Sequence, residues 1–154
     1  MTTSLVFYGA LGIVSTAIAF AGNRRLFVGG RGGRASVLEC LYYLLGIVSL
    51  GLGWYFNVRY VHQYGHEASY VDYTKALFSN WASDSAAQDY IMVNLILFPL
   101  WSITDGRRRG LRLPWIFFVM SLFTSLAFSV AFYLAFVERQ LRYNQEEPIA
   151  AGTS

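Results

Sequence analysis

The sequence has little cysteine and little charge. Cys40 is the one cysteine among 154 residues, so the chain cannot form an internal disulfide, and a C-x-x-C redox or zinc site is excluded. Charged residues make up 14% of the chain, whereas soluble proteins average about 25%. Hydrophobic residues make up 55%, which is more apolar surface than a soluble domain of this length can bury. The composition therefore favours a protein that lies in a lipid bilayer.

The sequence also lacks the patterns of common catalytic sites. It has no apparent Ser/His/Asp arrangement and neither the glycine spacing nor the Lys-Ser/Thr pair of a Walker-type loop. His62 and His66 are four residues apart, a spacing that can hold a metal ion on a helix, but Gly65 weakens a helix there. The glutamate of the H-E-x-x-H pattern is also missing. We therefore expect no enzyme activity, no cofactor and no metal site, with both histidines solvated or interfacial.

Four apolar runs dominate what is present. Each is about as long as the 20 residues that a helix needs to cross the hydrocarbon core, and backbone groups in lipid must be paired within the segment. The first and last runs carry no charge, and Glu39 and Asp89 are the charges of the second and third. The sequence predicts an all-α fold, a single membrane domain over 1–154 that forms a bundle of four transmembrane helices. These helices are expected at residues 4–22, 35–56, 86–104 and 115–137.

The basic residues predict the topology. The segment "NRRLFVGGRGGR" carries Arg24, Arg25, Arg31 and Arg34, and the segment "DGRRRGLR" carries Arg107, Arg108, Arg109 and Arg112. These are eight of the 12 basic residues, so the positive-inside rule places both loops in the cytoplasm. We expect a bacterial plasma (inner) membrane protein with both termini on the outer side. The arginines flank apolar runs, so we expect contact with anionic lipid headgroups and no binding of nucleic acid.

Several polar and aromatic residues inside or beside the runs are candidates for contact with lipids or partner proteins. Glu39 lies about one turn from the cytoplasmic end, where a structural ion pair is the favoured role and Arg34 marks the region that it can reach. The segment "SAAQ", residues 85–88, resembles a capping box and places Asp89 in the first turns of the third helix. Asn94 lies deeper and is expected to hydrogen-bond across helices. Trp115, directly after Pro114, is a typical headgroup anchor.

The middle loop and the tail differ from the runs. Residues 57–84 are rich in aromatic side chains, and the spacing within 70–78 predicts a short amphipathic helix at the outer interface, with Trp81 as a further anchor. The tail, 138–154, is polar and is expected to fray unless something holds it.

Small residues mark faces of the first two helices, at Gly9, Gly12, Gly46, Ser49 and Gly53. Such faces favour close packing within the chain, and docking onto a separate protein is the alternative.

The chain also resembles a known family from about Gly46 to Arg139. The similar segments are "ALFSNWASDSAAQD", with Phe78, Asn80 and Asp89 in the places of its Phe-x-Asn segment and following acid, then "DGRRRGLRLPW" and "AFYLAFVERQ". This is a widespread bacterial family of small four-helix membrane proteins of unknown function. In the last segment Ala131 stands in place of an expected proline, and the order Glu138-Arg139 is reversed. The resemblance implies the fold and the topology, and it implies no reaction.

Two classes of function remain open from the sequence. The favoured one is a non-catalytic accessory or stabilising subunit of a larger cell-envelope membrane complex, with a transport system for lipid or another hydrophobic substrate as the expected setting. Small-residue helix faces, the aromatic outer loop and the few intramembrane polar groups suit contact with other membrane subunits in a hetero-oligomer. The alternatives are a stand-alone small transporter and an accessory subunit of a respiratory complex.

Overall fold

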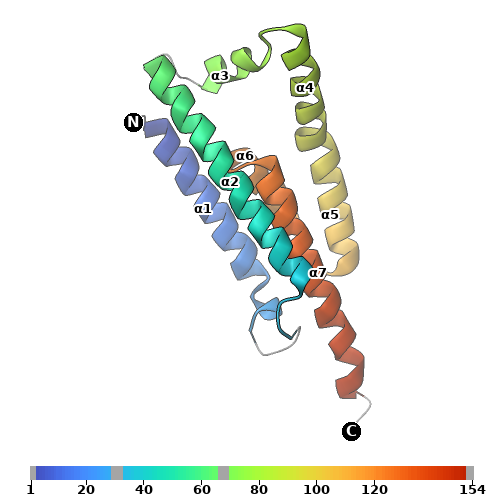
Figure 1. Ribbon diagram of the computed structural model, residues 1–154. Helices are drawn as coiled ribbons and strands as arrows, with labels where there is room; N and C mark the ends of the chain where they lie inside the picture. The colour runs from blue at the N-terminus through green and yellow to red at the C-terminus, as the bar shows by residue number, and fades with distance from the viewer. Residues whose placement is uncertain (1–2, 29–32, 66–69, 152–154) are drawn as a thin grey trace.

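Every regular element in the described part of the chain is a helix (Figure 1). The computed structural model describes residues 3–28, 33–65 and 70–151. In chain order the elements are α1 (Thr3–Gly22), η1 (Arg24–Leu26), α2 (Val37–Tyr64), α3 (Tyr70–Leu77), α4 (Trp81–Met92), η3 (Val93–Leu97), α5 (Phe98–Arg109), α6 (Ile116–Phe123) and α7 (Leu126–Ala151). η1 is a 3-10 turn and η3 is a π-helical segment. The predicted all-α class is confirmed.

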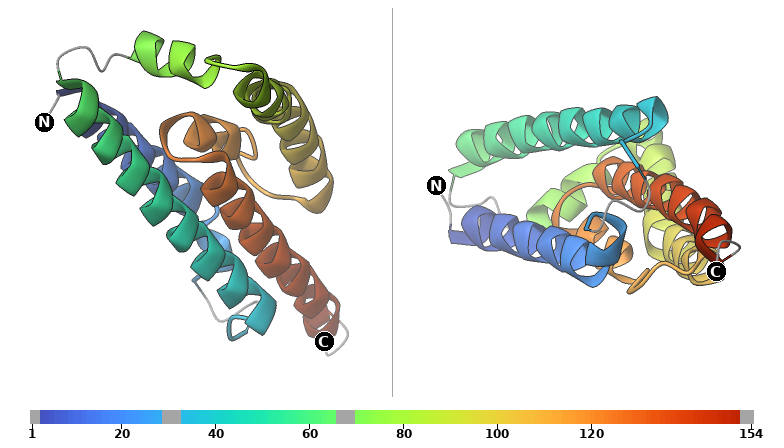
Figure 2. Two further views of the ribbon diagram at one scale, coloured as in Figure 1. Left: turned by 45° about the horizontal axis from the view of Figure 1, so that its top comes forward. Right: turned by 90° about the horizontal axis from the view of Figure 1, so that it is seen from below.

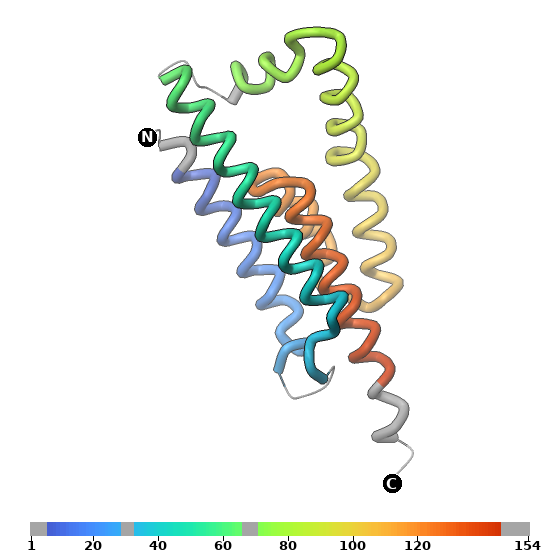
Figure 3. Tube along the Cα trace, in the orientation of Figure 1, coloured from blue at the N-terminus to red at the C-terminus, as the bar shows by residue number. Residues whose placement is uncertain are grey.

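The helices run up and down between two ends of the molecule (Figures 1 and 3). α1 and α2 are antiparallel, α3 crosses at the end where α1 begins, and α4, η3 and α5 form one continuous run back. α6 then turns back, packs on α1 and leads into α7, which packs on α2. We call the end that holds the last turns of α1 and α5 and the first turn of α2 the basic end, and the end that holds α3 the distal end.

Two helices are long and apolar enough to cross a membrane, fewer than the four that the sequence predicts. They are Val37–Tyr64 and the continuous run Trp81–Arg109, and Val6–Gly22 is a shorter apolar helix. Many apolar side chains on the outer faces of these two helices are exposed. Examples are Leu44, Leu45, Ile47 and Val48 on α2, and Leu95, Ile96, Leu97 and Leu100 on η3 and α5.

The predicted continuous helix at 115–137 is wrong, because the chain reverses direction at Thr124 and Ser125 (Figure 2). Thr124 leaves the helical region, with φ −118° and ψ −99°, and its hydroxyl donates to the Met120 carbonyl at 2.7 Å. The Ser125 hydroxyl accepts the Phe128 N–H at 3.1 Å and so caps the start of α7. α6 has 8 residues and is therefore about 12 Å long, less than half of the roughly 30 Å hydrocarbon core. We call α6 and the first half of α7 the half-height hairpin.

The hairpin also places the start of α1 and the end of α7 at opposite ends of the molecule, whereas the sequence predicts both termini on one side of the membrane. α1 begins at the distal end, whereas α7 passes the basic end and continues to Ala151 (Figure 1). The predicted polar tail is thus part of a helix as far as Ala151. Among the contacts that hold α7 there, Arg139 donates to the Leu26 carbonyl at 3.2 Å, and Asn144 donates to the Arg109 carbonyl at 3.3 Å.

The first residue of α2 lies close to its predicted position, whereas α4 begins several residues earlier than predicted. The Ser36 hydroxyl caps α2 by accepting the Glu39 N–H at 3.1 Å, within two residues of the predicted start. Asn80 caps α4 by accepting the N–H groups of Ala82 and Ser83, so the helix begins before the predicted capping box at 85–88. Asp89 therefore lies about two turns inside the helix and not in its first turn.

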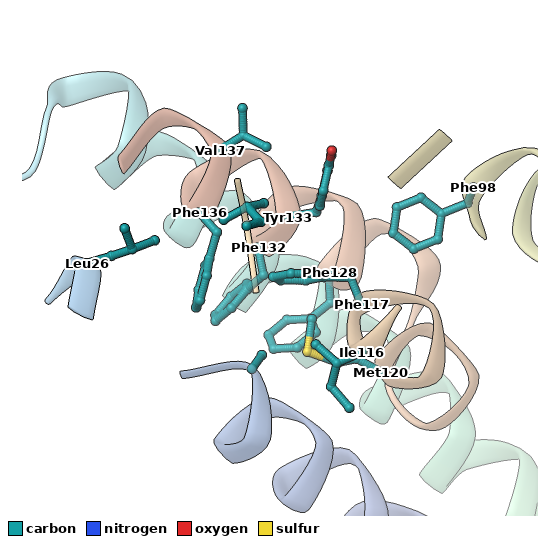
Figure 4. Packing of buried hydrophobic residues seen from close by; sticks show 12 residues of the cluster. Leu26, Phe98, Ile116, Phe117, Met120, Phe128, Phe132, Tyr133, Phe136 and Val137 are labelled. Carbon is teal, nitrogen blue, oxygen red and sulfur yellow. The ribbon is translucent and has the colours of Figure 1, made fainter. Parts of the chain in front are cut away.

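The buried core lies where the hairpin meets the other helices at the basic half (Figure 4). Tyr133, Phe117 and Phe136 have no exposed surface, and their rings meet edge to face at 5.2–5.4 Å. Edge-to-face contact of this kind adds to the free energy gained from burial. α7 thus supplies an aromatic ridge that fixes the hairpin against α1, α2 and α5.

Candidate functional site

An ion-pair cluster around Glu39 joins α2 to α7 at the basic end. The Glu39 side chain is fully buried, and its two oxygens contact Arg139, at 2.6 Å, and Arg142. The Ser36 hydroxyl donates to Glu138 at 3.0 Å, and Arg142 also donates to the Arg34 carbonyl. The expected structural ion pair is therefore present, but its partners come from α7, and the Arg34 side chain is not one of them. Removal of one member would leave an uncompensated buried charge, which is costly.

A second polar cluster joins α5 to α7. The Asp105 carboxylate accepts from Arg109 at 2.7 and 2.8 Å and from the Tyr133 hydroxyl at 2.7 Å. Gly106 makes the junction compact, because a Cβ there would lie 2.6 Å from Cβ of Pro114. Arg109 thus makes an internal contact, but its side chain is 37% exposed, so its contact with a lipid headgroup stays a prediction.

Hydrogen bonds also join the two basic loops to each other. The fully buried Asn23 side chain donates to the Arg112 carbonyl at 2.8 Å and accepts the Arg112 N–H at 2.9 Å. Arg25 donates to the Gly110 carbonyl at 2.5 Å. We call the paired Asn23–Arg112 hydrogen bonds the loop clasp. The clasp places the end of α1 beside the loop that leads into α6.

The other predicted arginines point away from these networks. Arg107, Arg108 and Arg112 are exposed, as is Arg24 beside the clasp. Trp115 is 43% exposed and stands at the start of α6, and its role as a headgroup anchor stays a prediction. The structure therefore divides the basic residues of this end into those that hold helices together and those that stay open to a ligand.

A polar layer crosses the molecule at the tip of the half-height hairpin. The Ser121 hydroxyl donates to the buried Asn94 side chain at 2.7 Å, and the hydroxyls of Ser49 and Ser125 lie 3.1 Å apart. Asn94 belongs to the π-helical η3, a geometry that often marks functional positions. The predicted hydrogen bond of Asn94 across helices is therefore present.

Small residues let the other helices close on this hairpin. A Cβ on Gly12 would lie 3.1 Å from the Phe123 carbonyl oxygen, and a Cβ on Gly46 would lie 2.9 Å from the Phe132 ring. A Cβ on Gly9 would lie 2.7 Å from the Trp54 ring. The predicted small-residue faces are therefore used for packing within the chain.

The distal end carries the remaining candidates and brings them into no common site. Trp81 is 91% exposed at the start of α4, and Asp89 is exposed and accepts a hydrogen bond from its neighbour Gln88. α3 has formed where the amphipathic helix was expected. His62 is exposed on α2, whereas His66 lies outside the described residues. Within the described ranges no three His, Cys, Asp or Glu side chains gather as metal ligands would.

Sequence reasoning missed the residues that carry the two buried clusters. The sequence alone assigns no site to Arg139 and Arg142, to Asp105 and Tyr133, or to Asn23. A signal existed for the first pair, because residues three apart on a helix share a face. The direction of α7 was needed to bring that face to Glu39.

Residues 41–139 match a protein family that is described as "Protein of unknown function DUF2834". The matched region covers more than half of the chain, from the second turn of α2 to Arg139 in the Glu39 cluster. This agrees with the resemblance to a family of unknown function. No curated protein and no solved structure matches the chain.

Proposed function

Because the chain belongs to the DUF2834 family, whose function is unknown, we propose a role from the geometry: a multi-pass membrane protein that serves as a non-catalytic accessory subunit of a larger cell-envelope complex. For the complex itself, the proposal keeps the setting that the sequence favours, a bacterial transport system for lipid or another hydrophobic substrate. The proposal rests on three features of the molecule: its charge asymmetry, its apolar exterior and the tip of the half-height hairpin.

Charge asymmetry supports a membrane orientation with the basic end in the cytoplasm. Because α7 returns to the basic end, its arginines join those of the two loops there, and the positive bias is stronger than in the predicted topology. The described basic residues at this end are Arg24, Arg25, Arg34, Arg107, Arg108, Arg109, Arg112, Arg139 and Arg142. At the distal end they are Arg59 and Lys75. The long apolar helices α2 and α4–α5 supply the crossings.

The tip of the half-height hairpin is the main structural support for an accessory role. Thr124 and Ser125 are partly exposed, and they lie beside Gly12 and Ser49, midway along α1 and α2. Non-helical backbone at membrane depth is stable only where protein covers it or water reaches it. α1 and α2 cover one part of the tip. We propose that a transmembrane helix of a partner subunit covers the rest.

The distal half of the bundle has room for such a helix. In the described residues α4 packs on α3 and on η3, and it has no extended packing with α1 or α2. Side chains such as Leu52, Phe56 and Met92 are each at least half exposed in this half. The hydroxyls of Thr124 and Ser125 already have partners within the chain, so close approach to the tip is the requirement, which favours a helix with small residues.

Site-specific photocrosslinking in the native host tests the proposal. A photoreactive phenylalanine analogue at Phe123, a partly exposed ring at the tip, is compared with the same analogue at Leu100, which is 61% exposed in the basic half. We expect Phe123, and not Leu100, to crosslink to one membrane protein that also co-purifies stoichiometrically in mild detergent. Crosslinks to lipid alone at both positions, from a protein that purifies without partners, would contradict an accessory role.

One feature favours a second candidate, a stand-alone small transporter. The end of α6 and the start of α7 meet at mid-depth, and half-helix ends of this kind hold substrates and ions in many transporters. In that case the purified protein alone would move a substrate across liposome membranes. The crosslinking experiment separates the two candidates, because the transporter needs no partner at Phe123.

A further inference from the structure

The loop clasp fixes the position of two arginines that the rest of the chain leaves open. Asn23 pairs with the backbone of Arg112 through two hydrogen bonds, so Arg24 and the Arg112 side chain extend from adjacent points. Both side chains are exposed, and neither has a carboxylate within ion-pair distance among the residues that the structure describes. Two arginines that extend from adjacent points of the backbone are suited to a phosphate group.

The loop that carries Arg112 is held in one unusual conformation. Leu113 has a φ of +53°, a left-handed value that is rare for a residue with a side chain. Its side chain lies against Gly22, where a Cβ would be 2.7 Å from the Leu113 Cδ1 atom. Pro114 packs against Gly106 on the other side. Backbone strain of this kind persists where the surroundings impose it, and it clusters at binding sites.

Exposed apolar side chains lie close to these arginines in the sequence of the two loops. Leu113 is 39% exposed and Trp115 is 43% exposed, and Val28 in the other loop is 55% exposed. A ligand that meets both groups must be amphipathic, with an anionic head and an apolar body. Free phosphate and nucleic acid lack the apolar part.

We propose that the loop clasp forms a binding site for the headgroup of an anionic phospholipid. Arg24 and Arg112 contact the phosphate, and Leu113 and Trp115 contact the glycerol and the first methylene groups. Basic pockets between transmembrane helices on the cytoplasmic side bind such headgroups in other proteins. The site rests on the membrane location proposed above, and it would anchor the basic end independently of any partner at the hairpin tip.

Binding of defined lipids to the delipidated protein in detergent, followed by native mass spectrometry, tests the site. The probes are cardiolipin, phosphatidylglycerol and phosphatidylcholine with the same acyl chains, and inorganic phosphate as a competitor. We expect tighter binding of the two anionic lipids and no competition by millimolar phosphate. Equal binding of phosphatidylcholine, or displacement of lipid by phosphate, would overturn the proposal.

Three variants separate a built site from general charge attraction. The double variant Arg24→Gln/Arg112→Gln keeps the clasp, because the clasp uses the Arg112 backbone. It is expected to bind anionic lipid about 30-fold more weakly, since each basic residue contributes about fivefold to the affinity. Asn23→Ala keeps every arginine but removes the clasp, and it should weaken binding by about threefold or more. Arg59→Gln/Lys75→Gln removes the same charge at the distal end and should bind as the wild type does.

The outcomes distinguish the two proposals from each other. If Asn23→Ala and the double variant both bind like the wild type, or if the distal variant loses as much affinity as the double variant, there is no site at the clasp. A chain that does not insert into vesicles, shown by flotation, would instead contradict the membrane location itself. Circular dichroism and the melting temperature of each variant confirm that it is folded.

Discussion

Substitution of Gly12 by alanine tests the packing of the hairpin tip against α1. The added Cβ would lie 2.9 Å from Cγ2 of Thr124 and 3.1 Å from the Phe123 carbonyl oxygen. The second contact is with backbone, so rotation of a side chain does not relieve it. Overpacking of this kind costs about 1–3 kcal/mol. Gly51→Ala is the matched control, because a Cβ at Gly51 meets nothing within 4 Å.

Both glycines lie inside helices, so alanine brings each variant the same gain in helix propensity, about 1 kcal/mol. The difference between the two variants therefore isolates the steric cost. One kcal/mol shifts the melting temperature of a chain of this size by about 2–4 °C. Gly12→Ala should melt about 2–12 °C below Gly51→Ala when thermal unfolding is followed by circular dichroism in detergent. Equal melting temperatures would refute the contact between the hairpin tip and α1.

Three further substitutions test other contacts by the same thermal assay. Glu39→Gln removes the buried carboxylate that two arginines share, and it should lower the melting temperature by about 6 °C or more. The control is Glu138→Gln, because Glu138 lies 3.8 Å from its arginine partner, and it should change the melting temperature by less than about 2 °C. Tyr133→Phe leaves Asp105 without its tyrosine donor and should cost about 1.5–3 kcal/mol; an unchanged midpoint would argue against that hydrogen bond. Asn80→Ala removes the cap of α4, at a cost of about 1 kcal/mol, and hydrogen exchange should rise in the first turn of α4 while the hairpin stays protected.

Much of the helical content was readable from the sequence because it depends on local composition. The apolar runs placed α1 and α2, and the aromatic spacing around Tyr73 placed α3. Gly46 and Ser49 pointed to close packing, and the structure has it at Phe132 and Ser125. These features follow from short stretches of chain, each of which favours one structure.

The half-height hairpin was not readable in the same way. Hydroxyl residues such as Thr124 and Ser125 also occur inside continuous apolar helices, where their side chains donate a hydrogen bond to a carbonyl one turn back. Their presence alone therefore does not predict that a helix ends. The break depends on Gly12, which lies more than 100 residues away and leaves room for the turn. The partners of Glu39 were hidden for the same reason, because Arg139 reaches it only after the chain has reversed.

Cysteine labelling on intact cells tests the central claim, that the half-height hairpin returns the chain to the basic end. The native Cys40 is exposed at the basic end, and Ser79→Cys and Gln145→Cys, each in a Cys40→Ser background, place single thiols at the distal end and on α7. We expect an impermeant maleimide to label Ser79→Cys directly, and to label Cys40 and Gln145→Cys only after the membrane is permeabilised. Labelling of Gln145→Cys on intact cells, together with Ser79→Cys, would mean that residues 115–137 cross the membrane completely, and it would contradict the hairpin.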